Sequence, residues 1–205
     1  VWGRYTFLGY DPKLEITCMN GEMCIRESGS EEGAKEPVAH PGAKIKEILK
    51  EYTSPKVKDL PSFTGGLVGY FSYDYVKYSE PKLNLDADDQ EGFKDVDLML
   101  FDKVIAFDNL RQKIYIIANA RTENLEQEYD RCLAEIEEIV DLIEHGTPAQ
   151  ITPGKITSEF RPLFSEQEYC AMVEKAKHYI YEGDIFQVVL SNRLEADYEG
   201  SLFNA

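Results

Sequence analysis

Several segments of the first 120 residues alternate between apolar and polar side chains, a pattern that predicts β-strands. Segments 14–19 and 22–27 flank Asn20-Gly21, a residue pair typical of a two-residue hairpin turn. The remaining strands are predicted at 4–10, within 61–76, at 96–107 and at 113–118, with a turn at Asp108-Asn109 and loops at 28–37 and 79–95. The first part of the chain is therefore predicted to be rich in antiparallel strands.

Other segments repeat their apolar residues at helical spacing and are predicted to form helices at 41–52, 124–144 and 165–181. Pro41 suits the first turn of its helix, and Ser165 with Glu168 makes a capping box. Asn124 and Gln127 are expected to cap the second helix. Its predicted apolar stripe consists of Leu125, Tyr129, Leu133, Ile136, Val140 and Ile143.

A proline-containing stretch without periodicity divides the chain. We predict an N-terminal domain over 1–150, a linker over 151–162 and the beginning of a second domain over 163–205, where a strand at 185–194 follows the last helix. The fold class is therefore α+β: an antiparallel, strand-rich N-terminal domain with flanking helices, followed by one helix–strand unit.

The composition is that of a folded protein with an acidic surface. The chain has 205 residues, 43% of them hydrophobic, and a formal net charge of -16. This charge argues against partners made of nucleic acid or anionic membrane, both of which attract Lys and Arg. No apolar run is long enough to span a membrane, and no signal peptide is present, so we expect a cytoplasmic protein. The chain opens on Val1 without an initiator Met, which suggests a fragment.

Cysteine and glycine patterns allow few kinds of site. Cys18 and Cys24 flank the predicted turn, so a disulfide is one alternative and reduced thiols are the favoured one. The motif Gly65-Gly66-x-x-Gly69 lacks the Lys and Ser or Thr of a phosphate-binding loop. Close approach of another backbone explains these glycines better.

Three sequence motifs carry a resemblance to a known family. They are EGDIFQVVLSNR at 182–193, WGRYTFLGYDP at 2–12 and PSFTGGLVGYFSYD at 61–74. The first resembles the opening of the catalytic domain of chorismate-utilising enzymes, in the form found in anthranilate synthase component I. The other two resemble its N-terminal domain. The resemblance therefore covers almost the whole chain, and it implies that 163–205 begins a truncated chorismate-binding domain.

The resemblance implies a lyase of tryptophan biosynthesis. Anthranilate synthase component I converts chorismate and ammonia to anthranilate and pyruvate. It needs Mg²⁺, receives ammonia from a glutamine amidotransferase subunit (component II), and is inhibited allosterically by tryptophan. The ligands of Mg²⁺ are expected beyond residue 205, so we expect this chain to be inactive alone.

The resemblance also singles out two site residues. Arg4 is expected near the tryptophan effector site, where a guanidinium suits a carboxylate; a surface Arg at a strand edge is the alternative. Gln187 is expected to point from strand 185–194 into the chorismate cavity and to position the nucleophile or substrate. Family members that add water to chorismate place a Lys at this position, where it can act as a general base.

Two other functions stay open at the level of sequence. Within the family, the alternative is aminodeoxychorismate synthase component I, whose distinguishing motif would lie downstream. Outside the enzymes, the isolated chain could be a regulatory or interaction module without catalysis.

Overall fold

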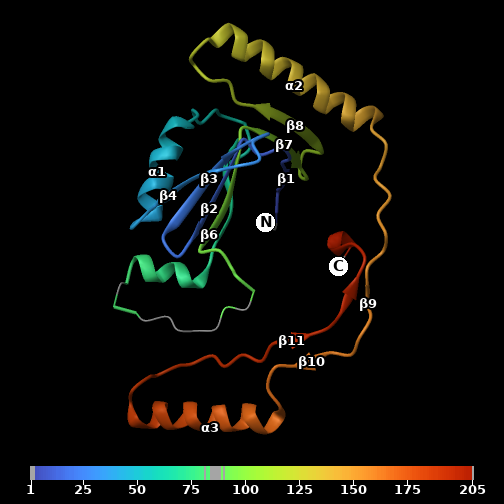
Figure 1. The fold of residues 1–205 in the computed structure, drawn as a ribbon. Coiled ribbons are helices and arrows are strands. Elements are labelled where there is room, and N and C mark those ends of the chain that lie inside the picture. Colours follow the sequence, from blue (N-terminus) through green and yellow to red (C-terminus); the bar gives the residue numbers. More distant parts are fainter. Residues whose placement is uncertain (1–2, 81, 84–88, 90, 205) are drawn as a thin grey trace. The chain divides into compact units, whose positions relative to one another are not determined.

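The structure is a computed structural model that describes residues 3–80, 82–83, 89 and 91–204 (Figure 1). It divides into two compact units, Val1–Gly146 and Thr147–Ala205. Both units combine helices with antiparallel strands, which confirms the predicted α+β class.

The first unit contains a five-stranded antiparallel sheet in the order β4-β3-β2-β6-β5 (Figure 1). Strands β2 and β3 form the predicted hairpin, and both turn residues, Asn20 and Gly21, have positive φ angles of 49° and 81°. These angles are those that an Asn-Gly turn accommodates with little strain. The strand bounds are β2 Leu14–Met19, β3 Glu22–Glu27, β4 Ala34–Pro37, β5 Gly66–Phe71 and β6 Val96–Phe101.

The core of this unit lies between one face of the sheet and helix α1 (Pro41–Glu51), whose first residue is the proline expected there. Alternate residues of β2 and β6 point to the same face, as the period of two requires. Burying a side chain such as Ile16, which has no exposed surface, contributes about 1.5–3 kcal/mol. The core cluster consists of Ile16, Cys18, Met23, Ile45, Val96 and Leu98.

A second, three-stranded sheet has the order β1-β7-β8, with β1 Tyr5–Leu8, β7 Lys103–Asp108 and β8 Lys113–Ala118. The turn predicted at Asp108-Asn109 joins β7 to β8, as expected. The single strand predicted at 96–107 is wrong, because β6 and β7 are separate strands on either side of Asp102. The Asp102 carbonyl oxygen accepts hydrogen bonds from the backbone and side-chain nitrogens of Asn119, both at 2.8 Å. The backbone bond extends the register of β7 with β8 by one pair beyond Lys103 and Ala118.

Helix α2 (Leu125–His145) packs on β8, but with a stripe rotated from the predicted one. Cys132 and Ile139 are its buried residues, whereas Tyr129, Leu133 and Val140 remain exposed. A helix that covers the edge of a small sheet buries a narrow stripe, and hydrophobicity alone does not fix its rotation. The predicted cap is also wrong: Asn124 has a positive φ and makes no side-chain capping bond.

Three other segments differ from the prediction or lie partly outside the described residues. The expected loop at 28–37 contains β4, which completes the backbone ladder of β3 despite its polar sequence. The strand expected within 61–76 is shorter, and a 3-10 helix, η1, spans Tyr73–Tyr78. The acidic loop expected at 79–95 lies partly outside the described residues.

Gly65 and Gly69 of the 65–69 motif allow close backbone approach, which confirms the interpretation made from the sequence. A Cβ atom on Gly69 would collide with the carbonyl oxygen of Asp97 on β6. A Cβ atom on Gly65 would lie 2.9 Å from the carbonyl oxygen of Phe101 and 2.8 Å from Nδ2 of Asn119. Only glycine therefore lets β5 start this close to β6 and to the end of β8.

The second unit consists of α3 (Glu166–Glu182) and short paired strands. The capping box is present as predicted, with the Ser165 hydroxyl accepting from the Glu168 N–H and the Glu168 carboxylate accepting from the Ser165 N–H. The short elements are β9 Lys155–Ile156, β10 Arg161–Pro162, β11 Leu194–Glu195, β12 Tyr198–Glu199 and the 3-10 helix η2 Leu202–Asn204. Strand β9 pairs with β12, and β10 pairs with β11.

The strand predicted at 185–194 is wrong for residues 185–193, which lie in neither helix nor strand. Local contacts take the place of a strand ladder here: the Asn192 side chain exchanges hydrogen bonds of 3.0 and 2.9 Å with the Phe164 backbone. The Tyr169 hydroxyl donates to the Leu190 carbonyl at 3.3 Å. Among the described residues no other strand lies alongside 185–193, and an apolar alternating pattern needs such a partner to become a strand.

Candidate functional site

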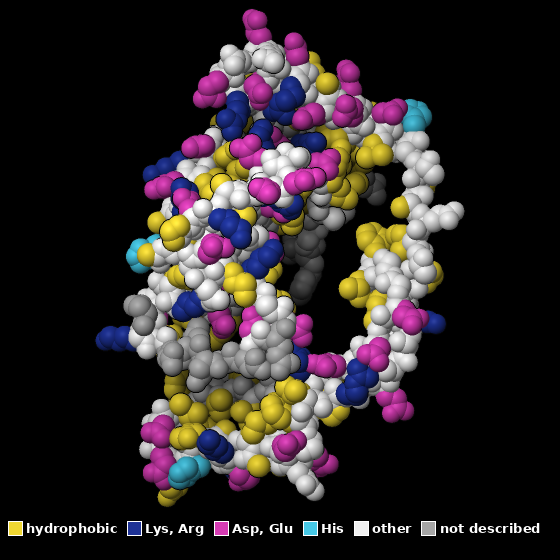
Figure 2. All heavy atoms as spheres, viewed as in Figure 1, with side chains coloured by type: hydrophobic (Ala, Val, Ile, Leu, Met, Phe, Trp, Pro, Cys, Tyr) yellow, Lys and Arg dark blue, Asp and Glu magenta, His cyan; other side chains and the backbone are white. Residues whose placement is uncertain are grey.

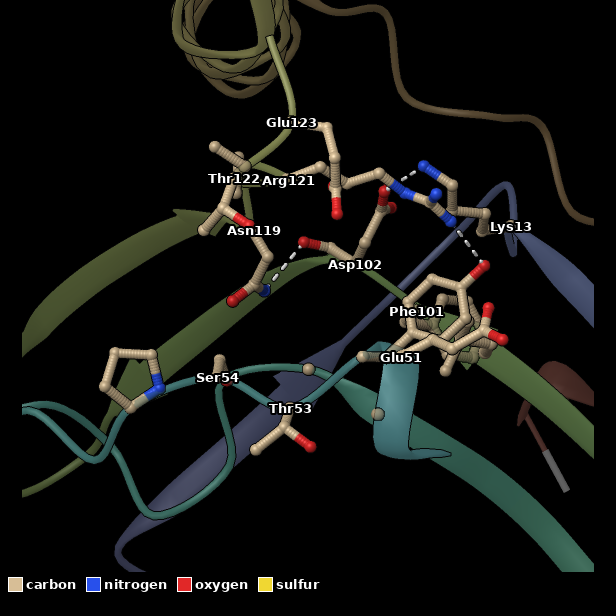
Figure 3. Close-up of a pocket in the computed structure, with 17 residues that line it drawn as sticks. Lys13, Glu51, Thr53, Ser54, Phe101, Asp102, Asn119, Arg121, Thr122 and Glu123 are labelled. Carbon is tan, nitrogen blue, oxygen red and sulfur yellow. Dashed lines mark hydrogen bonds and ion pairs between the residues drawn. The ribbon is translucent and has the colours of Figure 1, made fainter. Parts of the chain in front are cut away.

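A cavity of about 480 Å³ lies in the first unit, at the junction of its two sheets (Figure 3). Its walls come from the beginning of β2 and β5, the ends of β6 and β8, and the end of α1. This volume falls within the range of pockets that hold small molecules. The lining residues are spread between Lys13 and Glu123, so no local motif in the sequence points to the cavity.

Asn119 joins the elements that form this cavity. Its Nδ2 donates to the carbonyl oxygens of Thr64 and Asp102, both at 2.8 Å. These bonds tie the start of β5 and the β6–β7 junction to the end of β8. Among the described residues nothing donates to the Oδ1 of Asn119, which is therefore an available acceptor.

The segment that follows Asn119 is anchored to α2 by Arg131. Its Nη2 donates to the Asn119 carbonyl oxygen at 3.1 Å and to Glu128 at 2.8 Å, while Nη1 donates to Glu135 at 2.8 Å. Glu128 also accepts from the Arg121 N–H at 3.2 Å. These bonds, from Arg131 first and then from the Arg121 N–H, lower the pKa of Glu128. These bonds hold residues 119–121, which form one wall of the cavity, in place in the absence of a ligand.

The cavity contains charges of both signs (Figure 3). Lys13 Nζ lies 3.0 Å from Oδ2 of Asp102, which makes one ion pair. Arg121 Nη2 donates instead to the neutral Tyr52 hydroxyl at 3.0 Å, with its guanidinium 5.3 Å from the ring centre. Glu51 and Glu123 also line the cavity, both with exposed side chains.

Arg4, the residue expected near the tryptophan effector site, forms an ion pair with Asp108 of the same chain. Its Nε and Nη2 donate to the two oxygens of Asp108 at 3.1 and 2.7 Å, while the N–H groups of Leu110 and Arg111 donate to Oδ1. The Asp108 side chain is completely buried, and that of Arg4 is one-third exposed. The bonds from Arg4 first, and then those from the backbone, lower the pKa of Asp108 to about 2.

The structure places Gln187 on an exposed position in the segment 185–193. Gln187 and Arg4 belong to different units. Their roles stay predictions.

A second polar cluster, centred on Asp95, was not predicted from the sequence. Asp95 accepts from the Tyr78 hydroxyl at 2.7 Å and from the Asn20 N–H at 2.8 Å, and it lies 2.7 Å from Lys77 Nζ. Burial raises the pKa of Asp95, but the bonds from Lys77, Tyr78 and Asn20 outweigh it and leave this pKa below its ordinary value. The cluster fastens η1 to the β2–β3 turn, which is a structural role.

The described part of the chain offers no evident metal centre. In residues 3–80, 82–83, 89 and 91–204, no group of three or more His, Cys, Asp or Glu side chains is placed to hold a metal ion. The described residues therefore do not fit the Mg²⁺ that the resemblance implies. Among the helices of these same residues, none has the length and apolar character needed to cross a membrane.

Comparison with known proteins identifies the class to which this fold belongs. The family model described as chorismate binding enzyme matches residues 3–205, so the chain belongs to the chorismate-binding enzyme family. Within that family, it is 34% identical over 211 residues to anthranilate synthase component 1 of Acetivibrio thermocellus. It is 36% identical over 206 residues to the protein of the same name from Aquifex aeolicus.

These alignments cover nearly all of this chain but less than half of each relative. They span 99% and 98% of the chain, against 42% and 41% of the two relatives. The crystal structure of anthranilate synthase component I from Streptococcus pneumoniae has the same fold, with a TM-score of 0.68 at 23% sequence identity. That match covers 100% of this chain and 44% of the other. The family and the fold expected from the sequence motifs are thus confirmed.

The Arg4–Asp108 pair makes the stability of the first unit dependent on pH. Because the pKa of Asp108 in the folded state is about 2, below its ordinary 3.8, its contribution is fully present above 3.8 and is lost as the pH falls toward 2. We expect Asp108→Asn to lower stability at neutral pH and to flatten this acid dependence. Urea unfolding across the acid range measures both effects.

Asp130→Asn is the matched control, because Asp130 is exposed on α2. Its unfolding curves should follow those of the unmodified chain at every pH. An Asp108→Asn variant with the same acid dependence as the unmodified chain would show that the pair with Arg4 does not cause it.

Proposed function

We propose that this chain forms the N-terminal part of an anthranilate synthase component I, a cytoplasmic lyase that converts chorismate and ammonia to anthranilate and pyruvate. The observation that carries the proposal is the similarity to proteins of that name, at 34 and 36% identity along nearly the whole chain. Because the chain spans about two-fifths of these relatives, the reaction is assigned to the whole protein.

We also propose a partner subunit, an inhibitor and a metal ion for the whole protein. Ammonia is supplied by a glutamine amidotransferase subunit, and tryptophan acts as an allosteric inhibitor. Mg²⁺ would neutralise the carboxylates of chorismate and polarise the bond that breaks. Since the described residues hold no suitable cluster, we assign the Mg²⁺ ligands to other parts of the whole protein. The net charge of -16 agrees with this division, because a dianionic substrate needs cations held close to it.

The proposed reaction is tested by its fluorescent product. Purified whole protein, given chorismate, Mg²⁺ and ammonium, is expected to form anthranilate, and the 205-residue chain alone is expected to show no turnover. Glutamine should replace ammonium only when the amidotransferase subunit is added. Turnover by the 205-residue chain would contradict its inactivity, and aminodeoxychorismate as the product of the whole protein would contradict the reaction.

We further propose that Arg4 contributes to tryptophan inhibition. Its side chain remains one-third exposed beside Asp108, so N–H groups not engaged by Asp108 can meet an effector carboxylate. In the whole protein, Arg4→Ala is expected to raise the tryptophan concentration for half-inhibition by about tenfold or more, as for the loss of one charge-assisted hydrogen bond.

Asp108→Asn separates this role from a structural one, because it breaks the same ion pair but keeps the guanidinium. If Arg4 contacts the effector, inhibition in this control should stay closer to that of the unmodified protein. Equal weakening by both substitutions would mean that the ion pair, rather than contact with tryptophan, matters for inhibition.

We also propose that Gln187 positions the nucleophile or chorismate in the whole protein. An amide cannot take up a proton near neutral pH, but it can hold ammonia or a ring hydroxyl through hydrogen bonds. Ammonia already carries a lone pair, whereas water must lose a proton to attack. Gln187→Ala should therefore cost about 1–3 kcal/mol in kcat/KM, the value of one buried hydrogen bond.

Gln187→Lys provides the sharper test of this role. The lysine should lower ammonia-dependent turnover and permit some addition of water, detected as a hydroxylated product by chromatography. Ser191→Ala, in the same exposed segment, is the control and should retain normal kinetics. Unchanged chorismate kinetics in both folded Gln187 variants would remove Gln187 from the site.

A further inference from the structure

The Asn20-Gly21 pair at the β2–β3 turn carries a chemistry that is independent of the proposed reaction. An asparagine followed by glycine is prone to deamidation, because glycine has no Cβ atom to hinder the backbone nitrogen that follows the asparagine. That nitrogen attacks the side-chain carbon Cγ of the asparagine and closes a five-membered succinimide ring. Asn20-Gly21 is the only such pair in the sequence, and Asn20 is exposed.

The backbone nitrogen of Gly21, which is the nucleophile of this reaction, is held by Tyr78. Its N–H donates to the Tyr78 hydroxyl oxygen at 2.7 Å, and that hydroxyl donates to the buried Asp95 at 2.7 Å. Burial first, and then the bond to Asp95, raise the pKa of the Tyr78 hydroxyl, so it stays a neutral phenol and does not act as a base toward Gly21. Attack requires the Gly21 nitrogen to turn away from Tyr78 and lose this bond.

The two turn residues are also held on their other sides. The Asn20 N–H donates to Asp95 at 2.8 Å, and the Val38 N–H donates to the Gly21 carbonyl oxygen at 2.7 Å. The partners come from three segments: η1, the residue before β6 and the residue after β4. While these bonds persist, the peptide plane between Asn20 and Gly21 cannot rotate toward the Asn20 side chain.

The side-chain amide of Asn20, which is the electrophile, is activated by a neighbouring cation. Lys77 Nζ donates to Oδ1 of Asn20 at 2.9 Å. A positive charge at this oxygen stabilises the negative charge that develops there during attack. The turn therefore combines an activated amide with a restrained nucleophile, so the restraint limits the reaction.

We propose that Asn20 is a latent deamidation site, which η1 keeps unreactive through the contact of Tyr78 with Gly21. When this contact opens, the Gly21 nitrogen bonds to Cγ of Asn20, the Cγ–Nδ2 bond breaks, and ammonia leaves with the proton of the Gly21 N–H. Water then opens the succinimide at either of its two carbonyl carbons. The product is aspartate or isoaspartate at position 20, and no co-reactant other than water is consumed.

The modification weakens the contacts that restrained the turn. It adds one negative charge to a chain of net charge -16, on a surface where acidic and basic side chains are interspersed (Figure 2). Lys77, which already pairs with Asp95 at 2.7 Å, then faces two carboxylates that repel each other. Isoaspartate also inserts a methylene group into the backbone of a two-residue turn, which disturbs the register of β2 with β3. A modified chain therefore holds η1 less firmly.

Mass spectrometry of the 205-residue chain follows the reaction directly. Peptides that contain Asn20 are collected during incubation at constant pH, from the native chain and from the chain unfolded in guanidinium chloride. The native chain is expected to deamidate at least about tenfold more slowly, because attack requires local opening of the turn. Chromatography separates the aspartate and isoaspartate products. Equal rates in the native and unfolded chains would overturn the proposal.

Substitutions in η1 assign the protection to Tyr78. Tyr78→Phe removes the acceptor of the Gly21 N–H but keeps Lys77, so native deamidation should become about threefold faster or more, the scale of one lost hydrogen bond. Tyr73→Phe is the matched control, because the Tyr73 side chain lies in the same 3-10 helix and is exposed. It should deamidate like the unmodified chain. An unchanged rate in the folded Tyr78 variant would overturn the proposal.

Hydrogen exchange of the Gly21 amide decides the outcome if the Tyr78 variant does not fold. In the unmodified chain, NMR should show that this N–H exchanges at least about tenfold more slowly than in the unfolded chain, as expected for a bonded amide. Exchange at the rate of the unfolded chain would show that Tyr78 does not hold the nitrogen, and the proposal would fail. Neither result bears on the proposed reaction.

Discussion

The first unit depends on the way Asn119 holds the backbone at Asp102. Two donors of one residue, its backbone N–H and its Nδ2, reach the same carbonyl oxygen, both at 2.8 Å. The backbone bond extends the pairing of β7 with β8, and the side-chain bond adds a second contact at the point where β6 ends. The apolar run 96–107 divides at Asp102, with β6 in the five-stranded sheet and β7 in the three-stranded one. The cavity forms beside this division, where the ends of β6 and β8 meet.

The same residue explains the neighbouring glycine. The Nδ2 of Asn119 also donates to Thr64, directly before Gly65, and a Cβ atom on Gly65 would approach that nitrogen to 2.8 Å. Asn119 and Gly65 are thus required together, because Asn119 supplies the hydrogen bonds and Gly65 leaves the space for its side chain. Part of the 61–74 motif that carries the family resemblance is therefore explained by backbone packing, independently of any ligand.

The sequence predicted those features that depend on local chemistry. The Asn20-Gly21 turn, the Ser165–Glu168 capping box and the proline at the start of α1 need only a few neighbouring residues, and all are confirmed. Features that depend on distant partners were missed: they are the contact of Asn119 with Asp102 at the break between β6 and β7, and the pairing of the buried Asp108 with Arg4. The cavity could not be predicted for the same reason, since its charged residues lie on segments that only the fold brings together.

In the described residues of the second unit, helix α3 and the family motif around Gln187 lack packing partners for their apolar side chains. Helix α3 has no buried residue, although its sequence carries the apolar spacing of a packed helix. A helix of 17 residues without a buried side chain is marginal in water, since packing supplies most helical stability. The exposed apolar residues of 186–189 have the same need for a packing partner. Under the proposed function, the rest of a protein of the relatives' length would supply that partner, and packing against it would give Gln187 the fixed position that its role requires.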